Sequence, residues 1–578
     1  MRSGRITNLD KEDVMPKENY AWYYLGNGIE TFGIDGKPSK YEMKLPGKDE
    51  ILARVDAVAL CASDIKMIRM GNDYPLFKNR DFKQNPAILG HELSLTIEEV
   101  GENLKDRWKK GMRVGVQPDV YMNSVRYCMG VNVDGGMQHY ILLPKPVFYS
   151  DQGETIFEVD KKLSYASVAQ LEPNACAEAS YRAWGRNEFD KDGSILIYIG
   201  PEGDQEYTLD KELDHKKVVI FSKGNKTKKY PENAVDITSL NDAWKEAENG
   251  FEDILIVGNI ENEEFEDILE HISDTALICW LAEQETDQMI KADIAKIHYG
   301  KNNWIGTTSK CLSDAFLEEK QRYELRNRGT LLVMGGAGAM GRIHTLRAIM
   351  KESPPSQIVV TARRRKRLEA LLDDFGDIAK KHQVKLNIIA MEDPDWRKEL
   401  RNYCKEEGFD DIIVSAPGTE PVENAVPFLK KDGMLILFSG TKYGSYAKLP
   451  IGYVASYGAR INASSGSTVE DEKKVLRKIE AGQYHPDQNV MAIAGFKALK
   501  QAVEAVSQGK YPGKVIIYPQ LDDLPLLDIH KIGDYDKVFE GVQINGWNRE
   551  YEKKLYQKLT SVIVICISLR IDQCQPVQ

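Results

Sequence analysis

Residues 330–352 read TLLVMGGAGAMGRIHTLRAIMKE, and this stretch decides the fold of the second half of the chain. The apolar run predicts a buried strand, the motif Gly336-Ala337-Gly338-Ala339-Met340-Gly341 predicts a turn, and the remainder predicts a helix. This G-x-G-x-x-G pattern is typical of a dinucleotide-binding turn. Its first glycine allows the tight turn, its second lets the backbone approach a pyrophosphate, and its third permits close helix–strand packing. The helix N-terminus then presents free N–H groups and the positive end of its dipole to the phosphates.

The next predicted strand, QIVVTA at 357–362, ends without an acidic residue. Enzymes that use NAD usually place Asp or Glu there to bind the ribose hydroxyls. Here Ala362 is followed by Arg363 and Arg364, and a guanidinium group pairs well with a 2′-phosphate. The sequence therefore favours NADP(H) over NAD(H). The alternative is that these cations only line the solvated start of a helix.

From Gly193 onward, strand and helix signals alternate, which predicts parallel sheets. The strands are apolar throughout, as expected when helices cover both faces of a sheet. Three stretches at 193–200, 250–258 and 276–281 (GSILIYIG, GFEDILIVG, ALICWL) resemble, in the same order, 329–336, 408–416 and 434–439 (GTLLVMGG, GFDDIIVSA, MLILFS). We interpret this as an internal duplication. The alternative is that any two α/β units share such strings.

The upstream copy carries Gly200-Pro201-Glu202-Gly203-Asp204-Gln205 at the turn after its first strand. Glu202 stands where the second copy has Gly338, and Gln205 stands where it has Gly341. A carboxylate at that place would repel a pyrophosphate. Our hypothesis is that the first copy keeps the fold, has lost dinucleotide binding, and serves as an oligomer or domain interface.

Residues from about 40 to 147 read as short β runs bounded by turn residues, which predicts a β-rich domain. Three short motifs carry reactive side chains in or just after it. They are Cys61-Ala62-Ser63-Asp64, Gly90-His91-Glu92 and Leu171-Glu172-Pro173. Each is weak alone, because a buried Cys is usually a small hydrophobe and a lone His-Glu pair is more often on the surface.

In this order, ahead of the glycine motif, they resemble the medium-chain dehydrogenase/reductase family, most closely its sorbitol dehydrogenase-like branch. Asp134–Tyr140 (DGGMQHY) resembles that family's glycine pair, and 513–517 (GKVII) its return strand. The resemblance covers roughly 45–186 and 326–518, and it implies an α/β fold with a GroES-like zinc catalytic domain and two tandem Rossmann-type doubly wound parallel sheets, the first degenerate. The expected boundaries are 1–186, completed by 513–578, for the catalytic domain, 187–328 for the degenerate insert, and 329–512 for the nicotinamide dinucleotide-binding domain.

The resemblance also implies roles for individual residues. Cys61 and His91 would be zinc ligands. Glu92 and Glu172 would be the carboxylate ligands, with one of them alternating with water or held behind the ligands. Such a set suits one catalytic zinc with an open position. Ser63 would relay the proton of the bound alcohol, with Asp64 supporting the ligands from behind.

The chain departs from the family pattern in places. Only Cys128 lies where a four-cysteine lobe would be, so no structural zinc is expected. Lys66 stands where sorbitol dehydrogenases often have a relay His. Lys66, Arg69 and Lys78 are candidate phosphate-binding cations, although solvated surface is the simpler interpretation for each.

The implied activity is hydride transfer between NAD(P)(H) and a secondary alcohol or ketone of a sugar, polyol or sugar phosphate, as in a sorbose 1-phosphate reductase-like enzyme. Two alternatives stay open. One is a zinc-free reductase of the quinone or enoyl type, and the other is a non-catalytic scaffold that senses the nucleotide.

Composition narrows the remaining possibilities. The 578 residues are 42% hydrophobic and 29% charged, which predicts a soluble globular protein, and the net charge of −11 argues against nucleic acid as a partner. Eight scattered cysteines fit a reducing, cytoplasmic setting. The longest apolar run, at 561–569, is too short to span a bilayer, so we expect no membrane association and interpret it as a buried or interface strand. The expected partners are a small-molecule substrate and further copies of the chain.

Overall fold

The computed structural model describes residues 17–404, 406–542 and 546–558. The strand expected at 561–569 lies outside these residues. The chain divides into two compact units. Among the described residues, the first unit contains 17–170, 490–542 and 547–558, and is called the β-rich unit here. The second contains residues from 171 to 489 together with Gly546, and is called the double-sheet unit.

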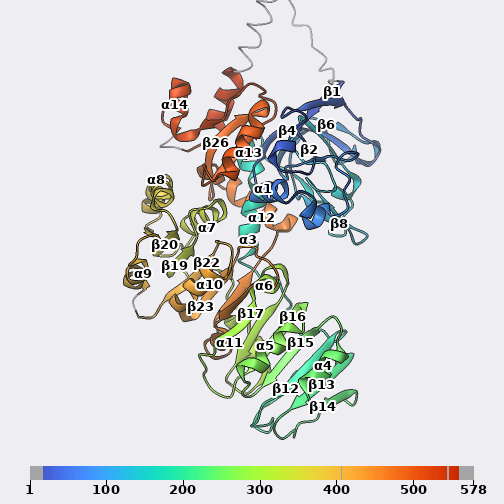
Figure 1. The fold of residues 1–578 in the computed structure, drawn as a ribbon, viewed down its shortest axis with the longest axis vertical. Helices are drawn as coiled ribbons and strands as arrows, with labels where there is room; N and C mark the ends of the chain where they lie inside the picture. Colours follow the sequence, from blue (N-terminus) through green and yellow to red (C-terminus); the bar gives the residue numbers. More distant parts are fainter. Residues whose placement is uncertain (1–16, 405, 543–545, 559–578) are drawn as a thin grey trace, which may run out of the picture. The chain divides into compact units, whose positions relative to one another are not determined.

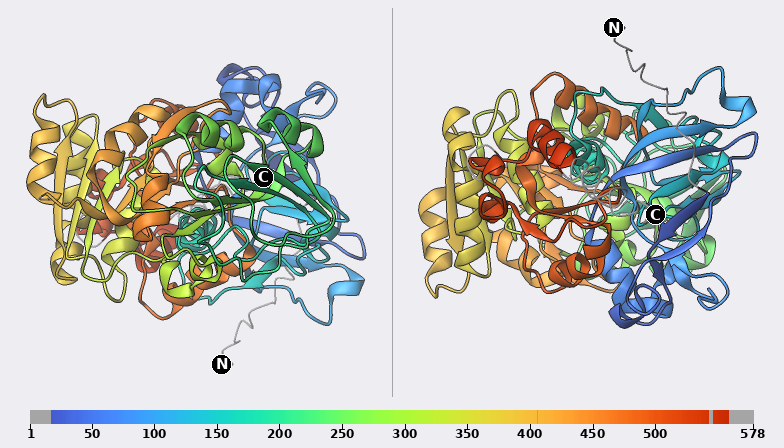
Figure 2. Two further views of the ribbon diagram at one scale, coloured as in Figure 1. Left: turned by 90° about the horizontal axis from the view of Figure 1, so that it is seen from below. Right: turned by 90° about the horizontal axis from the view of Figure 1, so that it is seen from above.

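The β-rich unit is built on one large sheet with the strand order β11-β7-β6-β4-β27-β26-β28, in which β10 also pairs with β4. The late strand β27 pairs antiparallel with the early strand β4, so the red end of the chain joins the blue beginning in one sheet (Figures 1 and 2). The strands are β4 Ile51–Ala59, β6 Glu92–Val100, β7 Arg113–Val116, β10 Tyr140–Leu143, β11 Ile156–Glu158, β26 Val490–Gly495, β27 Lys514–Tyr518 and β28 Leu527–Asp528.

The chain returns to this sheet earlier than the expected residue 513. Strand β26 pairs in parallel with β27 and therefore already belongs to the β-rich unit from Val490 onward. At the other boundary, helix α3 (Leu171–Ala179) belongs to the double-sheet unit, although the expected catalytic domain runs to residue 186. The reason is packing, because α3 lies against α12 (Val469–Glu480) and α7 (Ala339–Ile349) of that unit.

The double-sheet unit contains two six-stranded parallel sheets of identical topology. The insert sheet has the order β14-β13-β12-β15-β16-β18, and the glycine-turn sheet has the order β21-β20-β19-β22-β23-β25. Numbered along the chain within each sheet, both follow the doubly wound order 3-2-1-4-5-6. The insert strands are β12 Ser194–Ile199, β13 Lys217–Ser222, β14 Ala234–Ile237, β15 Phe251–Val257, β16 Ile272–Leu281 and β18 Asn303–Thr307. The glycine-turn strands are β19 Thr330–Met334, β20 Gln357–Ala362, β21 Lys385–Ala390, β22 Phe409–Val414, β23 Leu429–Leu437 and β25 Arg460–Ala463.

The likeness of the two sheets extends to single contacts at the start of the fourth strand. Buried Asp253 accepts hydrogen bonds from the Arg186 guanidinium and from the backbone N–H of Asp190, which is four residues after Arg186. Buried Asp411 accepts the same pair of bonds from Arg322 and from the N–H of Arg326. The residue before each carboxylate repeats the pattern: Glu252 accepts from the N–H and hydroxyl of Ser194, and Asp410 from those of Thr330. These matched contacts support the duplication.

The sheets share one hydrophobic core, which contains side chains of both, such as Ile254 and Ile412. The described helices of this unit include α5 Asn262–Glu270, α6 Ile294–Tyr299, α8 Arg365–Lys381, α9 Trp396–Cys404 and α11 Ile451–Tyr457. In the part of the chain that the structure describes, no helix is long and apolar enough to cross a membrane.

Candidate functional site

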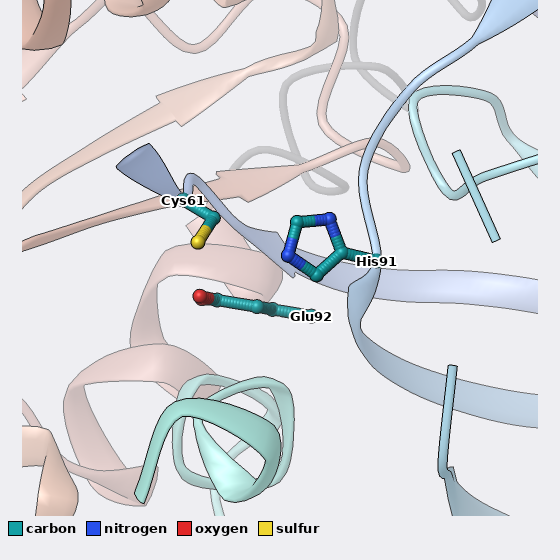
Figure 3. Close-up of side chains that lie close together, drawn as sticks. All are labelled: Cys61, His91 and Glu92. Carbon is teal, nitrogen blue, oxygen red and sulfur yellow. The ribbon is translucent and has the colours of Figure 1, made fainter. Parts of the chain in front are cut away.

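A thiol, an imidazole and a carboxylate converge in the β-rich unit. Ligand atoms of Cys61, His91 and Glu92 all lie within 4.8 Å of one another, and they form the one such group found among the described residues. Figure 3 shows the three side chains around a common space. Sulfur, nitrogen and oxygen donors at this spacing match the ligand types that zinc prefers.

The sequence brings Cys61 to this place through a strand-to-helix connection. Strand β4 ends at Ala59, and α1 (Ala62–Met70) begins directly after Cys61, which is its N-cap residue. The buried Asp64 carboxylate accepts the backbone N–H of Cys61 at 3.0 Å and that of Gly90 at 3.3 Å. Asp64 therefore ties the Cys61 turn to the loop that carries His91.

That loop depends on three glycines. Gly90 has φ +92°, a left-handed conformation that favours glycine. A Cβ on Gly135 would lie 2.4 Å from the Gly90 carbonyl oxygen, and one on Gly136 would lie 2.2 Å from the Leu93 side chain. The Gly136 N–H donates to the Gly90 carbonyl at 2.8 Å. The glycine pair in DGGMQHY thus holds the loop that presents His91.

Both nitrogens of His91 have polar neighbours. Nδ1 lies 3.4 Å from Asp64 Oδ1, and Nε2 lies 3.1 Å from Ser63 Oγ. Burial lowers the pKa of His91, but Asp64 and Cys61 outweigh it and raise that pKa well above its ordinary value. A cluster that stabilises an added proton also suits a metal cation, since both compete for the same lone pairs.

Glu92 has a partner that the sequence did not single out. Its carboxylate is fully buried, and its two oxygens accept from Lys514 Nζ at 2.5 and 2.8 Å. Lys514 is the first residue of β27 and is itself buried. In the sequence, the only sign of this partner was a single Lys before the apolar run VIIY. No local pattern shows which face of the sheet that Lys side chain occupies.

The other expected ligand, Glu172, lies in the double-sheet unit, in the first turn of α3, where its Oε1 accepts from Cys176 Sγ at 3.1 Å. Of the candidate phosphate-binding cations, Arg69 donates to the Ser507 carbonyl at 2.7 Å and to the Ser507 hydroxyl at 3.0 Å. Lys66 and Lys78 are exposed. The role of Glu172 and those of the three cations stay predictions.

The glycine motif forms the expected strand–turn–helix between β19 and α7. Gly338 is the N-cap of α7, and a Cβ there would meet only the Gly335 carbonyl, at 4.0 Å, so the space beside it is open. A Cβ on Gly341 would lie 2.4 Å from Gly336 Cα, which is the close packing expected of the third glycine. The left-handed residue of the turn is Gly335 (φ +76°), which the motif does not include, rather than Gly336. Gly336 instead packs tightly, because its Cβ would lie 2.4 Å from Val360.

The end of β20 is as the sequence suggests. Ala362 is its last residue, and Arg363 and Arg364 follow with exposed side chains. Arg365, by contrast, is paired with Asp393. Two exposed cations thus follow β20, and their role in binding a ribose 2′-phosphate stays a prediction.

The corresponding turn of the insert sheet is closed. Residues 200–216, all of which are described, contain no helix, so there is no counterpart of α7. The buried Asp204 carboxylate accepts from the Thr227 N–H and hydroxyl, both at 2.6 Å, and from the Tyr230 hydroxyl at 2.7 Å. The loop after β13 is therefore fastened across the turn. Glu202 accepts from the Asn259 side-chain amide at 2.5 Å.

Comparison with known proteins gives partial matches. Residues 47–150 match the alcohol dehydrogenase GroES-like domain. Mannitol-1-phosphate 5-dehydrogenase of Aliivibrio fischeri is 29% identical over 251 residues, which are 40% of this chain and 57% of that protein. L-sorbose 1-phosphate reductase of Klebsiella pneumoniae is 28% identical over 164 residues, 27% of this chain and 37% of that protein. Acryloyl-coenzyme A reductase of Sulfurisphaera tokodaii is 50% identical over 60 residues, 10% of this chain and 16% of that protein.

The chain spans about half the length, or less, of the curated relatives it matches. The matched domain includes Cys61, His91 and the glycine pair at 135–136. Outside the matched domain, the glycine-turn sheet has the doubly wound strand order, and its first strand leads through the glycine turn into helix α7. Residues 47–150 thus match an alcohol dehydrogenase GroES-like domain, and parts of the chain are similar to dehydrogenases and reductases.

Proposed function

We propose that this chain is a zinc-dependent oxidoreductase that transfers a hydride between NAD(P)(H) and a secondary alcohol or ketone of a sugar, polyol or sugar phosphate. The observation that carries the proposal is the convergence of Cys61, His91 and Glu92 within 4.8 Å. The open turn at Gly338 before α7 supports the dinucleotide part of it.

We propose Cys61, His91 and a carboxylate as the groups that hold one zinc ion. When bound, zinc supplies a Lewis acid for the substrate oxygen. Asp64 lies beside His91 Nδ1 and keeps the proton on that nitrogen, so that the Nε2 lone pair can bind the metal. The ion pair with Lys514 favours Glu92 as the carboxylate held behind the ligands.

Ser63 is proposed to move the proton. Its Oγ lies 3.1 Å from His91 Nε2, at the edge of the cluster and only partly buried. A hydroxyl there accepts a proton from a substrate alcohol and passes it toward solvent. Lys66, one turn of α1 further on, is the next exposed polar side chain on that helix.

The substrate class rests on the relatives' names and on the donor set. Two of the relatives quoted above are named for phosphorylated polyols or ketoses. We propose NADP(H) as the preferred cofactor because Ala362 replaces the ribose-binding acid and Arg363 and Arg364 are exposed. The predicted homo-oligomer stays a prediction.

A zinc-free reductase of the quinone or enoyl type is the second candidate, and the short match to acryloyl-coenzyme A reductase supports the enoyl type of reaction. Replacing Cys61 by Ala distinguishes the two. We expect bound zinc to fall from about one per chain to near zero, and turnover of polyols to fall about a thousandfold, because a Lewis acid contributes several kcal/mol to such a step. Metal analysis measures the bound zinc. Nicotinamide absorbance with a panel of polyols and sugar phosphates measures the turnover.

The matched control is Cys311→Ala, which removes a thiol of the double-sheet unit and should change neither quantity. Full turnover by metal-free Cys61→Ala would favour the zinc-free reductase. Binding of both zinc and dinucleotide by the unmodified chain, without turnover of any substrate in the panel, would favour the non-catalytic scaffold.

A further inference from the structure

The two sheets of the double-sheet unit meet through equivalent elements. Strand β17 (Ile290–Asp293) follows the fifth strand of the insert sheet, and β24 (Tyr446–Leu449) follows the fifth strand of the glycine-turn sheet. They pair antiparallel, with Ile290 opposite Leu449 and Asp293 opposite Tyr446. Figure 1 shows β17 and α11 where the green sheet meets the yellow and orange one. Contact of one element with its own counterpart is the arrangement of a two-fold dimer, here within one chain.

As a result, a helix of the insert reaches the glycine-turn sheet. Helix α6 directly follows β17, and its buried His298 donates from Nδ1 to the carbonyl of Leu437, the last residue of β23, at 3.2 Å. The next residue, Tyr299, lies with its ring centroid 5.6 Å from that of Tyr443. A Cβ on Gly440 would lie 2.7 Å from the Tyr299 hydroxyl. Residues 437–443 are therefore packed against α6.

This turn lies at the edge of the sheet that binds ligands in doubly wound folds. Such ligands occupy the crevice outside the carboxyl ends of the strands, near the point where the strand order reverses. Here the order reverses between β19 and β22, and β23 is the next strand. Helix α7, whose N-terminus bears the glycine turn, also contacts the segment, since the ring centroids of His344 and Phe438 lie 4.5 Å apart. The 437–443 turn and the glycine turn thus share one edge.

We propose that the insert acts as a built-in two-fold partner whose helix α6 forms part of the wall of the dinucleotide site, with His298 and Tyr299 positioning the 437–443 turn against the bound dinucleotide. Burial lowers the pKa of His298, so its ring is neutral near pH 7 and Nδ1 carries the proton that the Leu437 carbonyl accepts. This inference rests on the proposed dinucleotide binding by the glycine-turn sheet.

The internal symmetry offers a matched control. Helix α11 makes the reciprocal contact, because the Ser456 hydroxyl accepts the Thr286 N–H at 2.8 Å just after the fifth strand of the insert sheet. The same hydroxyl donates to the Thr286 carbonyl at 3.3 Å. Ser456→Ala therefore removes side-chain hydrogen bonding from the same interface, but beside the sheet whose turn is closed. A purely structural weakening of the interface would affect both sides alike.

The experiment measures dissociation constants of NADPH and NADH for the full chain by calorimetry, with thermal melting as a check on folding. We expect His298→Ala to weaken binding about five- to tenfold, the change that a lost hydrogen bond produces. His298→Asn, which keeps an N–H donor, should restore affinity to within about threefold, and Ser456→Ala should leave it unchanged. We expect Tyr299→Ala to weaken binding as much as His298→Ala does. Because Tyr299 is 38% exposed, this variant replaces His298→Ala if the latter fails to fold.

Unaltered affinity in both His298→Ala and Tyr299→Ala would overturn the inference. So would equal weakening by His298→Ala and Ser456→Ala, or failure of His298→Asn to restore binding. If the unmodified chain binds neither NADPH nor NADH, the proposed function is wrong. That outcome is distinct from a failure of the inference about α6, which requires a chain that binds the dinucleotide.

Discussion

The insert sheet and the glycine-turn sheet share strand order and the same buried carboxylate contacts, yet they differ at one turn. After β19 the chain forms the open Gly338 turn and α7, whereas after β12 it forms a loop fastened by Asp204. The shared contacts of Asp253 and Asp411 lie at the amino ends of the strands, and ligands bind at the carboxyl ends. A doubly wound sheet can therefore keep its strand order and these contacts while the turn at its carboxyl edge differs.

The largest expected effect comes from giving the glycine-turn sheet the acid of the other copy. Gly338→Glu places a carboxylate where the pyrophosphate would lie, and like charges at such a distance cost several kcal/mol. We expect dinucleotide affinity to fall about a hundredfold or more, measured by calorimetry with NADPH. The reciprocal Glu202→Gly should create no second site, because the insert sheet has no helix after that turn. Two dinucleotides bound per chain of Glu202→Gly would refute this account.

A second difference concerns buried histidines. In the insert sheet, His215 Nε2 lies 2.9 Å from the Asp253 carboxylate. On α7, which follows the first strand of the glycine-turn sheet, His344 Nδ1 lies 2.9 Å from the Tyr181 hydroxyl, and burial, reinforced by Arg347, lowers the pKa of His344 to about 3. Below about pH 6.5 the unfolded chain binds a proton at His344 that the folded chain does not bind. Its contribution to stability is therefore complete above pH 6.5 and is lost as the pH falls toward 3.

At pH 5 this loss should be about 2 kcal/mol in the free energy of unfolding. Urea denaturation at pH 7 and pH 5 measures it, and His344→Gln should show a correspondingly smaller fall than the unmodified chain. His271→Gln, at a partly exposed histidine between α5 and β16, should alter the difference by less than about 0.5 kcal/mol. An identical fall for the chain with and without His344 would show that this residue is not the cause.

The smallest effect tests the cations at the end of the second strand. Replacing Arg363 and Arg364 by Ser should weaken NADPH binding about tenfold, since charge-assisted hydrogen bonds are lost, and should leave NADH within about twofold. The counterpart in the insert sheet, Lys223, is already paired with Glu264 at 2.7 Å, and Lys223→Ala should change neither constant. Equal weakening of NADPH and NADH would instead support the view that these arginines only line the start of α8.

The local sequence predicted the two parallel sheets of the double-sheet unit. Short apolar runs such as TLLVM and DILIV predicted the strands, because a strand covered on both faces needs apolar residues throughout. The repeated Gly-Phe-acid-Asp-Ile string predicted the duplication, and the matched Asp253 and Asp411 contacts give it a physical cause. The predicted boundaries at 186 and 513 do not coincide with the ends of the two compact units, since β26 and α3 join their units through long-range packing that no local pattern records.

Sequence alone determined the residue types of the candidate site, Cys61, His91, Glu92 and the three glycines of the motif, because chemistry limits which side chains suit a metal or a pyrophosphate. Only the tertiary structure decided which neighbours they have. Lys514 reaches Glu92 from 422 positions away, and His298 reaches Leu437 from 139 positions away. Such partners depend on strand register and on which face of an element meets another, and those are properties of the packed chain rather than of any segment of it.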